Sequence, residues 1–221
     1  MQTNIPFCLP AFKLLVPGDL VFSRNFDESQ RPARTIFFDL DGTLWKDRGP
    51  GEIMNTLAKD IAERKVLEQL SPRWFRVAVS NQTFIGRQSR ISILQALKYR
   101  ARLDELIRLN MFDAVAICHH HPDAQISYLR TNCDSRKPYD GLFRNIISRF
   151  SLDPGSCLAV GDRITDIMAA SHAGIKECFL ISNKQAFNLN VSNLSPQDFY
   201  KFKVVADLAH FLTYVMDGQN D

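Results

Sequence analysis

Carboxylates suited to phosphoryl transfer directly follow a short apolar run near the start of this chain. Asp39 and Asp41 flank Leu40 after residues 35–38, and Gly42 beside them permits a sharp turn. A carboxylate such as Asp39 can act as a nucleophile, and Asp41 can protonate a leaving oxygen and later take a proton from water. The pair therefore fits chemistry through an aspartyl-phosphate. Taken alone, it would also fit an ordinary turn with helix-capping carboxylates.

Later positions supply the other groups that phosphoryl transfer requires. Ser80 offers a hydroxyl, and the amides after it can point at phosphate oxygens, while Lys137 can neutralise the transferring group. Asp39 and Asp162 can hold Mg²⁺ together with the main-chain carbonyl of Asp41, because this cation prefers oxygen ligands and shares them with phosphate. The order of these groups along the chain argues against the turn reading.

The elements that must position these groups alternate along the chain as repeated βα units would. Predicted strands are short apolar runs at 35–38, 75–79, 114–118, 157–160 and 178–181. Apart from Arg76 they are continuous rather than alternating, which indicates burial on both faces and a parallel sheet. Helical spacing predicts helices at 56–70, 89–109, 142–150 and 164–173, the last stopped by Gly174.

The predicted fold class is therefore α/β, a doubly wound (Rossmann-like) parallel sheet of about five strands without a large cap domain. In such sheets the chemistry lies just past the carboxyl ends of the strands, where the polar groups above occur. We expect one domain over residues 34–215, a lead-in at 1–33 and a tail at 216–221. The lead-in fits either a packed arm or a flexible tail.

Composition is that of a soluble globular protein. The 221 residues are 45% hydrophobic and 23% charged, and the net charge of +3 is too mild to argue for nucleic acid, although it suits an anionic substrate. The odd number of cysteines, five, argues against a disulfide framework and favours a reducing compartment. No apolar run approaches the roughly 18 residues of a membrane span, so we expect a cytoplasmic protein. The oligomeric state stays open.

Four segments resemble the motifs of the haloacid dehalogenase superfamily. They are 37–44, Phe-Phe-Asp-Leu-Asp-Gly-Thr-Leu; 79–81, Val-Ser-Asn; Lys137-Pro138; and Gly161-Asp162 with Asp166. The resemblance spans about residues 35 to 212. It implies a Mg²⁺-dependent phosphatase with Asp39 as nucleophile, Asp41 as acid and base, and Ser80 and Lys137 as further catalytic residues.

A narrower likeness is to the heptose bisphosphate and histidinol phosphatases. Residues 80–87, Ser-Asn-Gln-Thr-Phe-Ile-Gly-Arg, are similar to their second-motif loop, and residues 118–122 and 133–138 resemble their zinc loop. This likeness implies Cys118, His120 and Cys133 as possible zinc ligands. Ser135 stands where the family has a fourth, cysteine ligand. Either a water, His119 or His121 completes the site, or the loop has lost its metal.

The same likeness implies contacts with a phosphorylated substrate. The residues concerned are Asn81, Arg136, Arg163, Asp47 and Arg48. A solvated loop is an equally good reading of Asp47 and Arg48. The expected substrate is a sugar phosphate or bisphosphate, with histidinol phosphate and a polynucleotide 3′-phosphate as alternatives. A catalytically silent binding protein is a further alternative, against which the full set of carboxylates argues.

Overall fold

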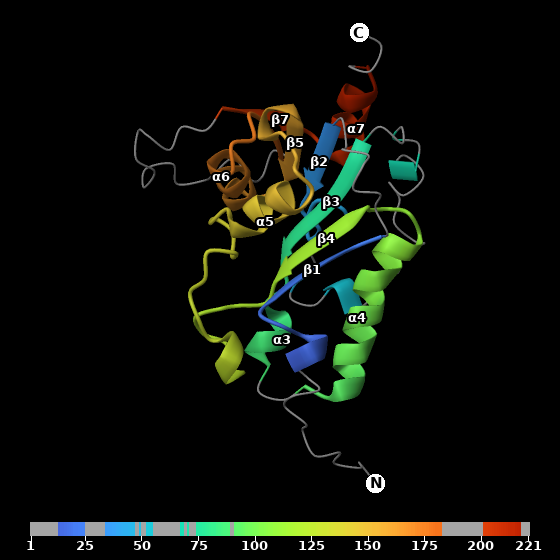
Figure 1. Ribbon diagram of the computed structural model, residues 1–221. Coiled ribbons are helices and arrows are strands. Elements are labelled where there is room, and N and C mark those ends of the chain that lie inside the picture. The colour runs from blue at the N-terminus through green and yellow to red at the C-terminus, as the bar shows by residue number, and fades with distance from the viewer. Residues whose placement is uncertain are drawn as a thin grey trace.

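In the described part of the chain, seven strands form one sheet with helices on both faces (Figure 1). The computed structural model describes residues 13–24, 34–46, 49, 52–54, 67–68, 70, 74–88, 91–182 and 201–217. The strands are β1 (Asp19–Ser23), β2 (Arg34–Phe38), β3 (Trp74–Asn81), β4 (Ala114–Cys118), β5 (Cys157–Gly161), β6 (Glu177–Ile181) and β7 (Phe202–Val205).

The sheet is doubly wound, as predicted. Its order is β1-β4-β3-β2-β5-β6-β7; the pairs from β4 to β7 are parallel, and β1 joins β4 antiparallel. The chain runs outward from β2 through β3 to β4 and then returns to β5 on the other side of β2. Ligands of such folds bind where the strand order reverses, which here is beyond the carboxyl ends of β2 and β5.

All five predicted strands are confirmed to within two residues, but the predicted number was too small. The two additional strands, β1 and β7, lie at the edges of the sheet. Residues of β7 are mostly exposed, so this strand lacks the continuous apolar run that buried strands show. β1 lies inside the lead-in, where its short apolar run is surrounded by prolines and polar residues and is not typical of a buried strand.

Helices α4 (Ile93–Arg108) and α7 (Leu208–Asp217) cover one face of the sheet, and α5 (Gly141–Arg149) and α6 (Ile164–His172) cover the other. Successive residues of β2 point to opposite faces: the ring of Phe38 lies 6.0 Å from that of Phe211, and Phe37 lies 5.1 Å from Phe143. Shorter elements are α3 (Phe84–Arg87), η1 (Glu52–Met54), η3 (Ser127–Leu129) and η4 (Pro154–Ser156). Both faces of the central strands are therefore buried, as their composition predicted.

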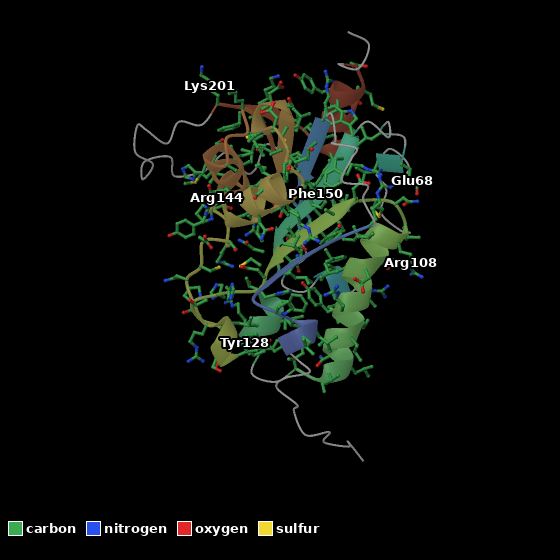
Figure 2. All side chains as sticks on the ribbon, in the orientation of Figure 1. Glu68, Arg108, Tyr128, Arg144, Phe150 and Lys201 are labelled. Carbon is green, nitrogen blue, oxygen red and sulfur yellow. The ribbon has the colours of Figure 1, made fainter. Side chains whose placement is uncertain are left out.

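Side chains divide as this layering requires (Figure 2). Arg108 and Arg144 are exposed at the periphery, whereas Phe150 is buried, with its ring 4.8 Å from that of Phe75 on β3. No helix among the described residues is long and apolar enough to cross a membrane.

The helix predicted at 89–109 begins later, at Ile93, because Ser92 caps it. The Ser92 hydroxyl accepts from the Gln95 amide at 3.1 Å, and Gln95 Oε1 accepts from the Ser92 amide at 2.9 Å. Helices α5 and α6 match their predicted ranges to within a residue at each end. The helix predicted at 56–70 lies outside the described residues except for 67, 68 and 70.

Part of the lead-in is a packed arm. β1 pairs along its whole length with β4, with Asp19 opposite Cys118, and the Arg24 amide donates to the Asp113 carbonyl at 3.1 Å. The Tyr128 hydroxyl donates to the Val16 carbonyl at 2.6 Å. Residues 13–24 are therefore an integral part of the fold and not an appendage; the rest of 1–33 lies outside the described residues.

Candidate active site

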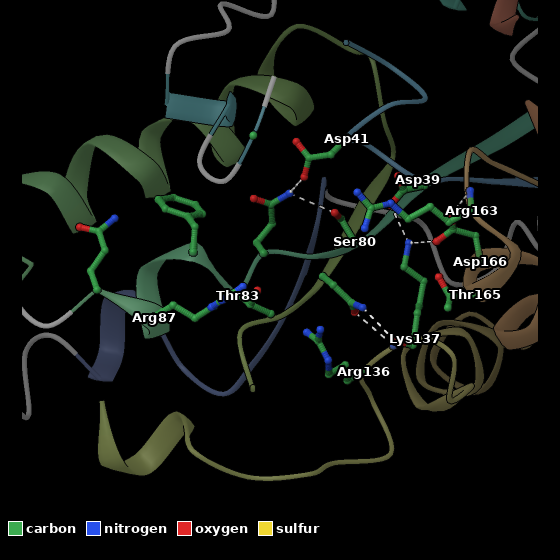
Figure 3. Close-up of a pocket in the computed structure, with 15 residues that line it drawn as sticks. Asp39, Asp41, Ser80, Thr83, Arg87, Arg136, Lys137, Arg163, Thr165 and Asp166 are labelled. Atoms are coloured by element: carbon green, nitrogen blue, oxygen red, sulfur yellow. Dashed lines mark hydrogen bonds and ion pairs between the residues drawn. The ribbon is translucent and has the colours of Figure 1, made fainter. Parts of the chain in front are cut away.

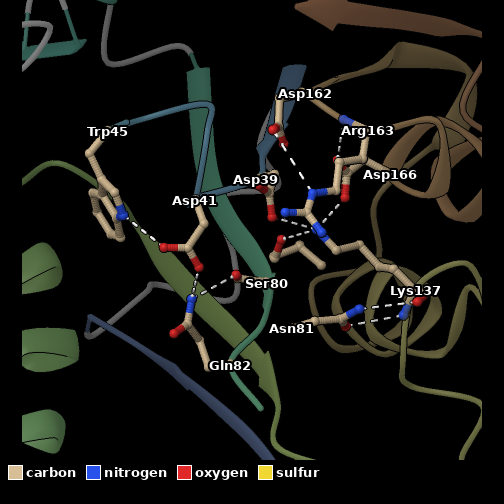
Figure 4. Close-up of polar contacts among 11 residues, drawn as sticks. Asp39, Asp41, Trp45, Ser80, Asn81, Gln82, Lys137, Asp162, Arg163 and Asp166 are labelled. Atoms are coloured by element: carbon tan, nitrogen blue, oxygen red, sulfur yellow. Dashed lines mark hydrogen bonds and ion pairs between the residues drawn. The ribbon is translucent and has the colours of Figure 1, made fainter. Parts of the chain in front are cut away.

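The side chain of Asp39 lies buried at the carboxyl end of β2, beside a lysine ammonium. Its amide donates to the Val160 carbonyl of β5 at 2.9 Å, which fixes the strand end at the reversal of the sheet. Lys137 Nζ lies 2.5 Å from Asp39 Oδ1 and 2.5 Å from Asp166 Oδ1 (Figure 4). Burial opposes the charge of Lys137, but Asp166 and Asp39 outweigh it and raise the pKa of the lysine.

Backbone contacts hold Lys137 in this place. Its Nζ donates to the Val79 carbonyl at 2.9 Å. The Asn81 side-chain amide donates to the Lys137 carbonyl at 3.0 Å, and its oxygen accepts from the Lys137 amide at 3.1 Å. Asn81 thus links the end of β3 to the lysine. The Lys137–Pro138 peptide bond is cis.

Three carboxylates, Asp39, Asp162 and Asp166, offer oxygen atoms within 4.8 Å of one another. Burial raises the pKa of Asp39, with Lys137 opposing and Asp166 adding to the effect. Burial, followed by Asp166, raises the pKa of Asp162 to about 6. Asp162 Oδ1 is buried and has no hydrogen-bond partner among the described residues. A hard divalent cation fits this arrangement, because it takes oxygen ligands and balances buried negative charge.

The Asp41 carboxylate is turned away from that group of three. Trp45 Nε1 donates to its Oδ1 at 2.8 Å, and Gln82 Nε2 donates to its Oδ2 (Figure 4). The same Gln82 nitrogen lies 3.0 Å from Ser80 Oγ, which accepts from it. The Asp41 side chain is therefore oriented from two sides, while its main chain remains beside Asp39.

A glycine makes the close approach of this loop to β5 possible. Gly42 has φ +85°, and a Cβ there would lie 2.1 Å from Asp162 Oδ2. The Gly42 amide donates to the Trp45 carbonyl at 2.8 Å, and the Leu44 amide donates to the Leu40 carbonyl at 2.8 Å. The residues after β2 thus form a tight turn that packs directly on the Asp162 carboxylate.

An open cavity of about 670 Å³ adjoins these groups, and its lining includes Asp39, Asp41, Ser80, Gln82, Lys137 and Asp166 (Figure 3). Asp39 and Asp41 lie along one wall, and Arg136 and Arg87 line the side away from Asp166. Burial, with Arg87 contributing, lowers the pKa of Arg136, whose Nη1 donates to the His120 carbonyl at 3.3 Å. Arg163 also lines the cavity. Cationic side chains at both ends of the cavity can therefore bind anionic groups of a substrate.

Of the predicted site residues, the structure brings together Asp39, Asp41, Ser80, Lys137, Asp162 and, around them, Asn81, Arg136 and Arg163. Asp47 and Arg48 lie outside the described residues. The contact of Asp166 with Lys137 was not predicted, nor were those of Gln82 and Trp45 with Asp41. Asp166 belonged to the fourth motif, which was the available signal, whereas nothing in the spacing pointed to Trp45.

A second cluster lies at the carboxyl end of β4, where the sequence placed the zinc loop. Cys118 Sγ is 3.5 Å from Cys133 Sγ and 3.7 Å from His120 Nδ1. Burial and the neighbouring Cys133 raise the pKa of Cys118. Asp19 of β1 joins this group, with Oδ1 3.4 Å from His120 Nδ1. The structure thus adds to the three predicted ligands a carboxylate that the sequence did not single out.

Comparisons with known proteins agree with this fold. The family described as HAD-hydrolase-like matches residues 135–190. The D-glycero-beta-D-manno-heptose-1,7-bisphosphate 7-phosphatase of Haemophilus ducreyi is 32% identical over 157 residues, which are 69% of this chain and 85% of that protein. The histidine biosynthesis bifunctional protein HisB of Actinobacillus pleuropneumoniae is 32% identical over 74% of this chain and 44% of that protein, so this chain spans less than half of HisB.

Solved structures share the fold. A chain from Mesorhizobium loti described as a HAD-like phosphatase superposes with a TM-score of 0.66, at 20% identity, over 91% of this chain and 92% of that chain. The D,D-heptose 1,7-bisphosphate phosphatase of B. bronchiseptica, complexed with magnesium and phosphate, gives a TM-score of 0.63 at 22% identity, over 84% of this chain and 99% of that chain.

Fold and site together define a phosphatase of the haloacid dehalogenase (HAD) type. The chain belongs to the HAD-like phosphatases, in the family of the heptose-1,7-bisphosphate phosphatases, and is 32% identical to the member from Haemophilus ducreyi.

Proposed function

We propose that this chain is a Mg²⁺-dependent phosphomonoester hydrolase that acts through an aspartyl-phosphate at Asp39 on a sugar phosphate or bisphosphate. The observation that carries the proposal is the placement of Asp39: it is buried at the cavity wall, in contact with Lys137, and grouped with Asp162 and Asp166. A nucleophile, an ammonium group and a cation site are thus combined at one point of the sheet.

The residues divide the chemistry into two steps. In the first, an Asp39 oxygen bonds to phosphorus while the bond from phosphorus to the ester oxygen breaks, and Asp41 gives that oxygen a proton. In the second, Asp41 takes a proton from a water that attacks the phosphorus, which releases phosphate and restores Asp39. Lys137 and the hydroxyl of Ser80 contact the phosphoryl oxygens. Mg²⁺, when bound, neutralises charge on those oxygens.

The predicted ligands of that cation are Asp39, Asp162 and the main-chain carbonyl of Asp41. The buried Oδ1 of Asp162, which has no hydrogen-bond partner in the described part of the chain, supports this assignment. Asp166 is grouped with the same carboxylates, and its contact with Lys137 and with the Arg163 amide at 3.0 Å orients it. Asp166 therefore acts as a partner of the lysine at the edge of the cation site.

Two cationic side chains support a substrate with a second phosphate. Arg136 and Arg87 line the cavity away from Asp166, and a cavity of about 670 Å³ has the size of a small-molecule site. Guanidinium groups suit phosphate because they bind it through two parallel hydrogen bonds. A sugar bisphosphate would place one phosphate at Asp39 and the other near these arginines. The likeness to the heptose bisphosphate phosphatases supports the same substrate class.

A structural zinc ion at Cys118, His120 and Cys133 is also part of the proposal. The three ligand atoms lie within 4.8 Å of one another, and thiolate and imidazole are the ligands that zinc prefers. The loop that follows carries Arg136 and Lys137 into the cavity. Zinc would fix this loop and take no part in the reaction.

Phosphate release from four substrate classes tests the proposal: sugar bisphosphates, sugar monophosphates, histidinol phosphate and 3′-phosphorylated oligonucleotides. We expect the highest kcat/KM with a sugar bisphosphate, complete loss of activity in EDTA and recovery with Mg²⁺. Histidinol phosphate is the second candidate because of the likeness to HisB. The highest kcat/KM on an oligonucleotide would contradict the proposed substrate class.

The matched variant is Asp39→Asn, which keeps the size of the side chain but removes the nucleophilic oxygen. Its kcat on the best substrate should fall at least about 10³-fold, with the thermal unfolding transition retained. A variant that keeps a substantial part of wild-type activity would refute the aspartyl-phosphate mechanism, and so would turnover in an exhaustively chelated sample.

A further inference from the structure

A carboxylate from β1 lies where the cysteine and histidine cluster needs a fourth ligand. Ser135 occupies the position of the missing cysteine, and a neutral hydroxyl is a poor ligand for zinc. We infer that Asp19 is the fourth protein ligand of a zinc site formed with Cys118, His120 and Cys133, so that zinc fastens β1 to the loop after β4. This inference rests on the zinc ion of the proposed function and adds a fourth ligand to it, but it does not depend on the phosphatase chemistry.

The distances between the ligand atoms fit a tetrahedral zinc ion. With Zn–S near 2.3 Å and Zn–N or Zn–O near 2.0–2.2 Å, tetrahedral geometry separates the ligand atoms by about 3.3–3.8 Å. Sγ of Cys118 lies 3.5 Å from Sγ of Cys133 and 3.7 Å from Nδ1 of His120. His120 Nδ1 lies 3.4 Å from Asp19 Oδ1. These edges match the expected separations without movement of the backbone.

The pairing of β1 with β4 brings Asp19 to the cluster. Asp19 lies opposite Cys118 in the antiparallel register, and residues directly opposite in such a pair point to the same face of the sheet. Gly18, the residue before Asp19, leaves room for the His120 imidazole, because a Cβ at position 18 would lie 2.2 Å from His120 Nε2. The main chain of β1 is thus shaped around the His120 ring.

In this arrangement Ser135 orients the Asp19 carboxylate and does not serve as a metal ligand. Its hydroxyl donates to Asp19 Oδ2 at 2.7 Å, which leaves Oδ1 to face His120. A hydrogen bond from a residue that does not itself bind the metal often orients a carboxylate that does. The serine therefore acts through the aspartate and does not itself bind the metal.

The two histidines beside His120 are engaged elsewhere. His119 is buried, and its ring bonds the Tyr99 hydroxyl at 2.9 Å and the Pro17 carbonyl at 2.6 Å. His121 Nδ1 accepts from the Asp123 amide at 3.0 Å. Neither belongs to the described cluster of metal-ligating side chains, whereas Asp19 does. Asp19 is therefore the protein side chain placed to complete the tetrahedron.

Zinc affinity measured by chelator competition in reducing buffer tests the assignment. Asp19→Asn keeps the size and the bond from Ser135 but removes the charged donor, so zinc affinity should fall at least about 10-fold. Asp134→Asn is the matched control: it lies beside Cys133 with a 75% exposed side chain that pairs with Arg144, and its affinity should change less than about twofold.

Hydrogen exchange supplies a second readout, which distinguishes Asp19 from a water as fourth ligand. Zinc should slow exchange of the β1 amides, residues 19–23, in the wild type and in Asp134→Asn, but not in Asp19→Asn. Any of three results would overturn the inference: unchanged zinc affinity in Asp19→Asn, less than about a tenth of an equivalent of zinc in wild-type protein purified without chelators, or a Cys118–Cys133 disulfide found under reducing conditions.

Discussion

Lys137 lies beside the buried carboxylates of Asp39 and Asp166 and the half-buried one of Asp162, and it neutralises only part of their charge; the exposed Arg163 guanidinium lies 4.0 Å from Asp162. Its ammonium contacts Asp39 and Asp166, and Asp162 adds a third negative group within the same cluster. Uncompensated charge in a buried site costs several kcal/mol, so the carboxylates either take up protons or bind a cation. The raised pKa values of Asp162 and Asp39 favour the uptake of protons, and Mg²⁺ would serve as the bound cation.

The role of Asp41 leads to a prediction about leaving groups. Asp41→Asn removes the proton donor, so kcat should fall by about 10²–10⁴-fold for alkyl phosphates such as sugar phosphates. Esters with acidic leaving groups need no proton and should lose much less. Steady-state kinetics on a sugar phosphate and on p-nitrophenyl phosphate measure the difference. Equal losses on both substrates would contradict the assignment of Asp41 as general acid.

Trp45→Phe tests the orientation of the Asp41 carboxylate and should have a smaller effect than Asp41→Asn. It keeps an aromatic ring but removes the indole N–H that donates to Asp41 Oδ1 at 2.8 Å. A lost hydrogen bond to a charged group corresponds to about 1.5–3 kcal/mol, so kcat should fall roughly 10-fold or more. Mg²⁺ affinity should not change, because Asp41 contributes only its main chain there. A change in Mg²⁺ affinity with normal kcat would contradict the contact's proposed role.

At the level of residues, sequence reasoning selected side chains that the structure brings together, and it missed several of the contacts that orient them. Asp39, Asp41 and Asp162 lie within three residues of a strand end, so their place at one edge of the sheet follows from the strand pattern. Lys137 meets Asp39 across 98 residues of sequence, and Asp19 meets Ser135 across 116. Such pairings depend on how elements pack, and short-range spacing carries no information about them.

Among the elements, the turn after β2 has the least freedom to change. Gly42→Ala would strain a backbone with φ +85° and would also push a methyl group into Asp162. We expect a loss of Mg²⁺ affinity of at least about 10-fold, measured by isothermal titration, because Asp162 must move.

Gly49 offers a matched control for that variant. Its φ is +119°, but a Cβ there would meet no atom of the residues that the structure describes within 4 Å. Gly49→Ala should therefore lower stability by about 1 kcal/mol through backbone strain alone and leave Mg²⁺ affinity unchanged. Equal effects of the two alanines on Mg²⁺ affinity would show that backbone strain, and not the overlap with Asp162, matters.

The accuracy of the predicted elements depends on how deeply each one is buried. The five strands that were predicted have neighbours on both sides, and their apolar runs are continuous apart from Arg76. β7 has the pattern of an exposed edge, and β1 draws its pairing from β4 alone. The sequence therefore predicted the interior of the sheet well and its two edges poorly.

At the scale of the whole molecule, Mg²⁺ should stabilise the fold in a pH-dependent way. The pKa of Asp162 is about 6 in the folded protein, against an ordinary value of 3.8. The metal-free folded state therefore binds protons more tightly than the unfolded state. The contribution of Asp162 to stability is fully present below about pH 4 and is lost as the pH rises through about 6.

Thermal unfolding with and without Mg²⁺ checks this expectation. At pH 7 and 100 times Kd, Mg²⁺ should add about 2.7 kcal/mol, which raises Tm by roughly 5–10 °C. At pH 5, where Asp162 is largely protonated, the shift should be much smaller. Asp162→Asn should abolish most of the shift at pH 7 and flatten the pH dependence of the metal-free protein. An equal Mg²⁺ shift at both pH values would refute the link to this carboxylate.

The antiparallel strand β1 also affects how copies of the protein associate with one another. β4 is an apolar strand, Ala-Val-Ala-Ile-Cys, with all five residues buried, and β1 occupies the outer edge of its backbone. An uncovered edge of this kind is a template on which a strand of another chain can pair. The short, polar-ended β1 therefore does more than hold Asp19 in place: it covers the apolar edge of β4, so that a strand of another copy cannot pair there.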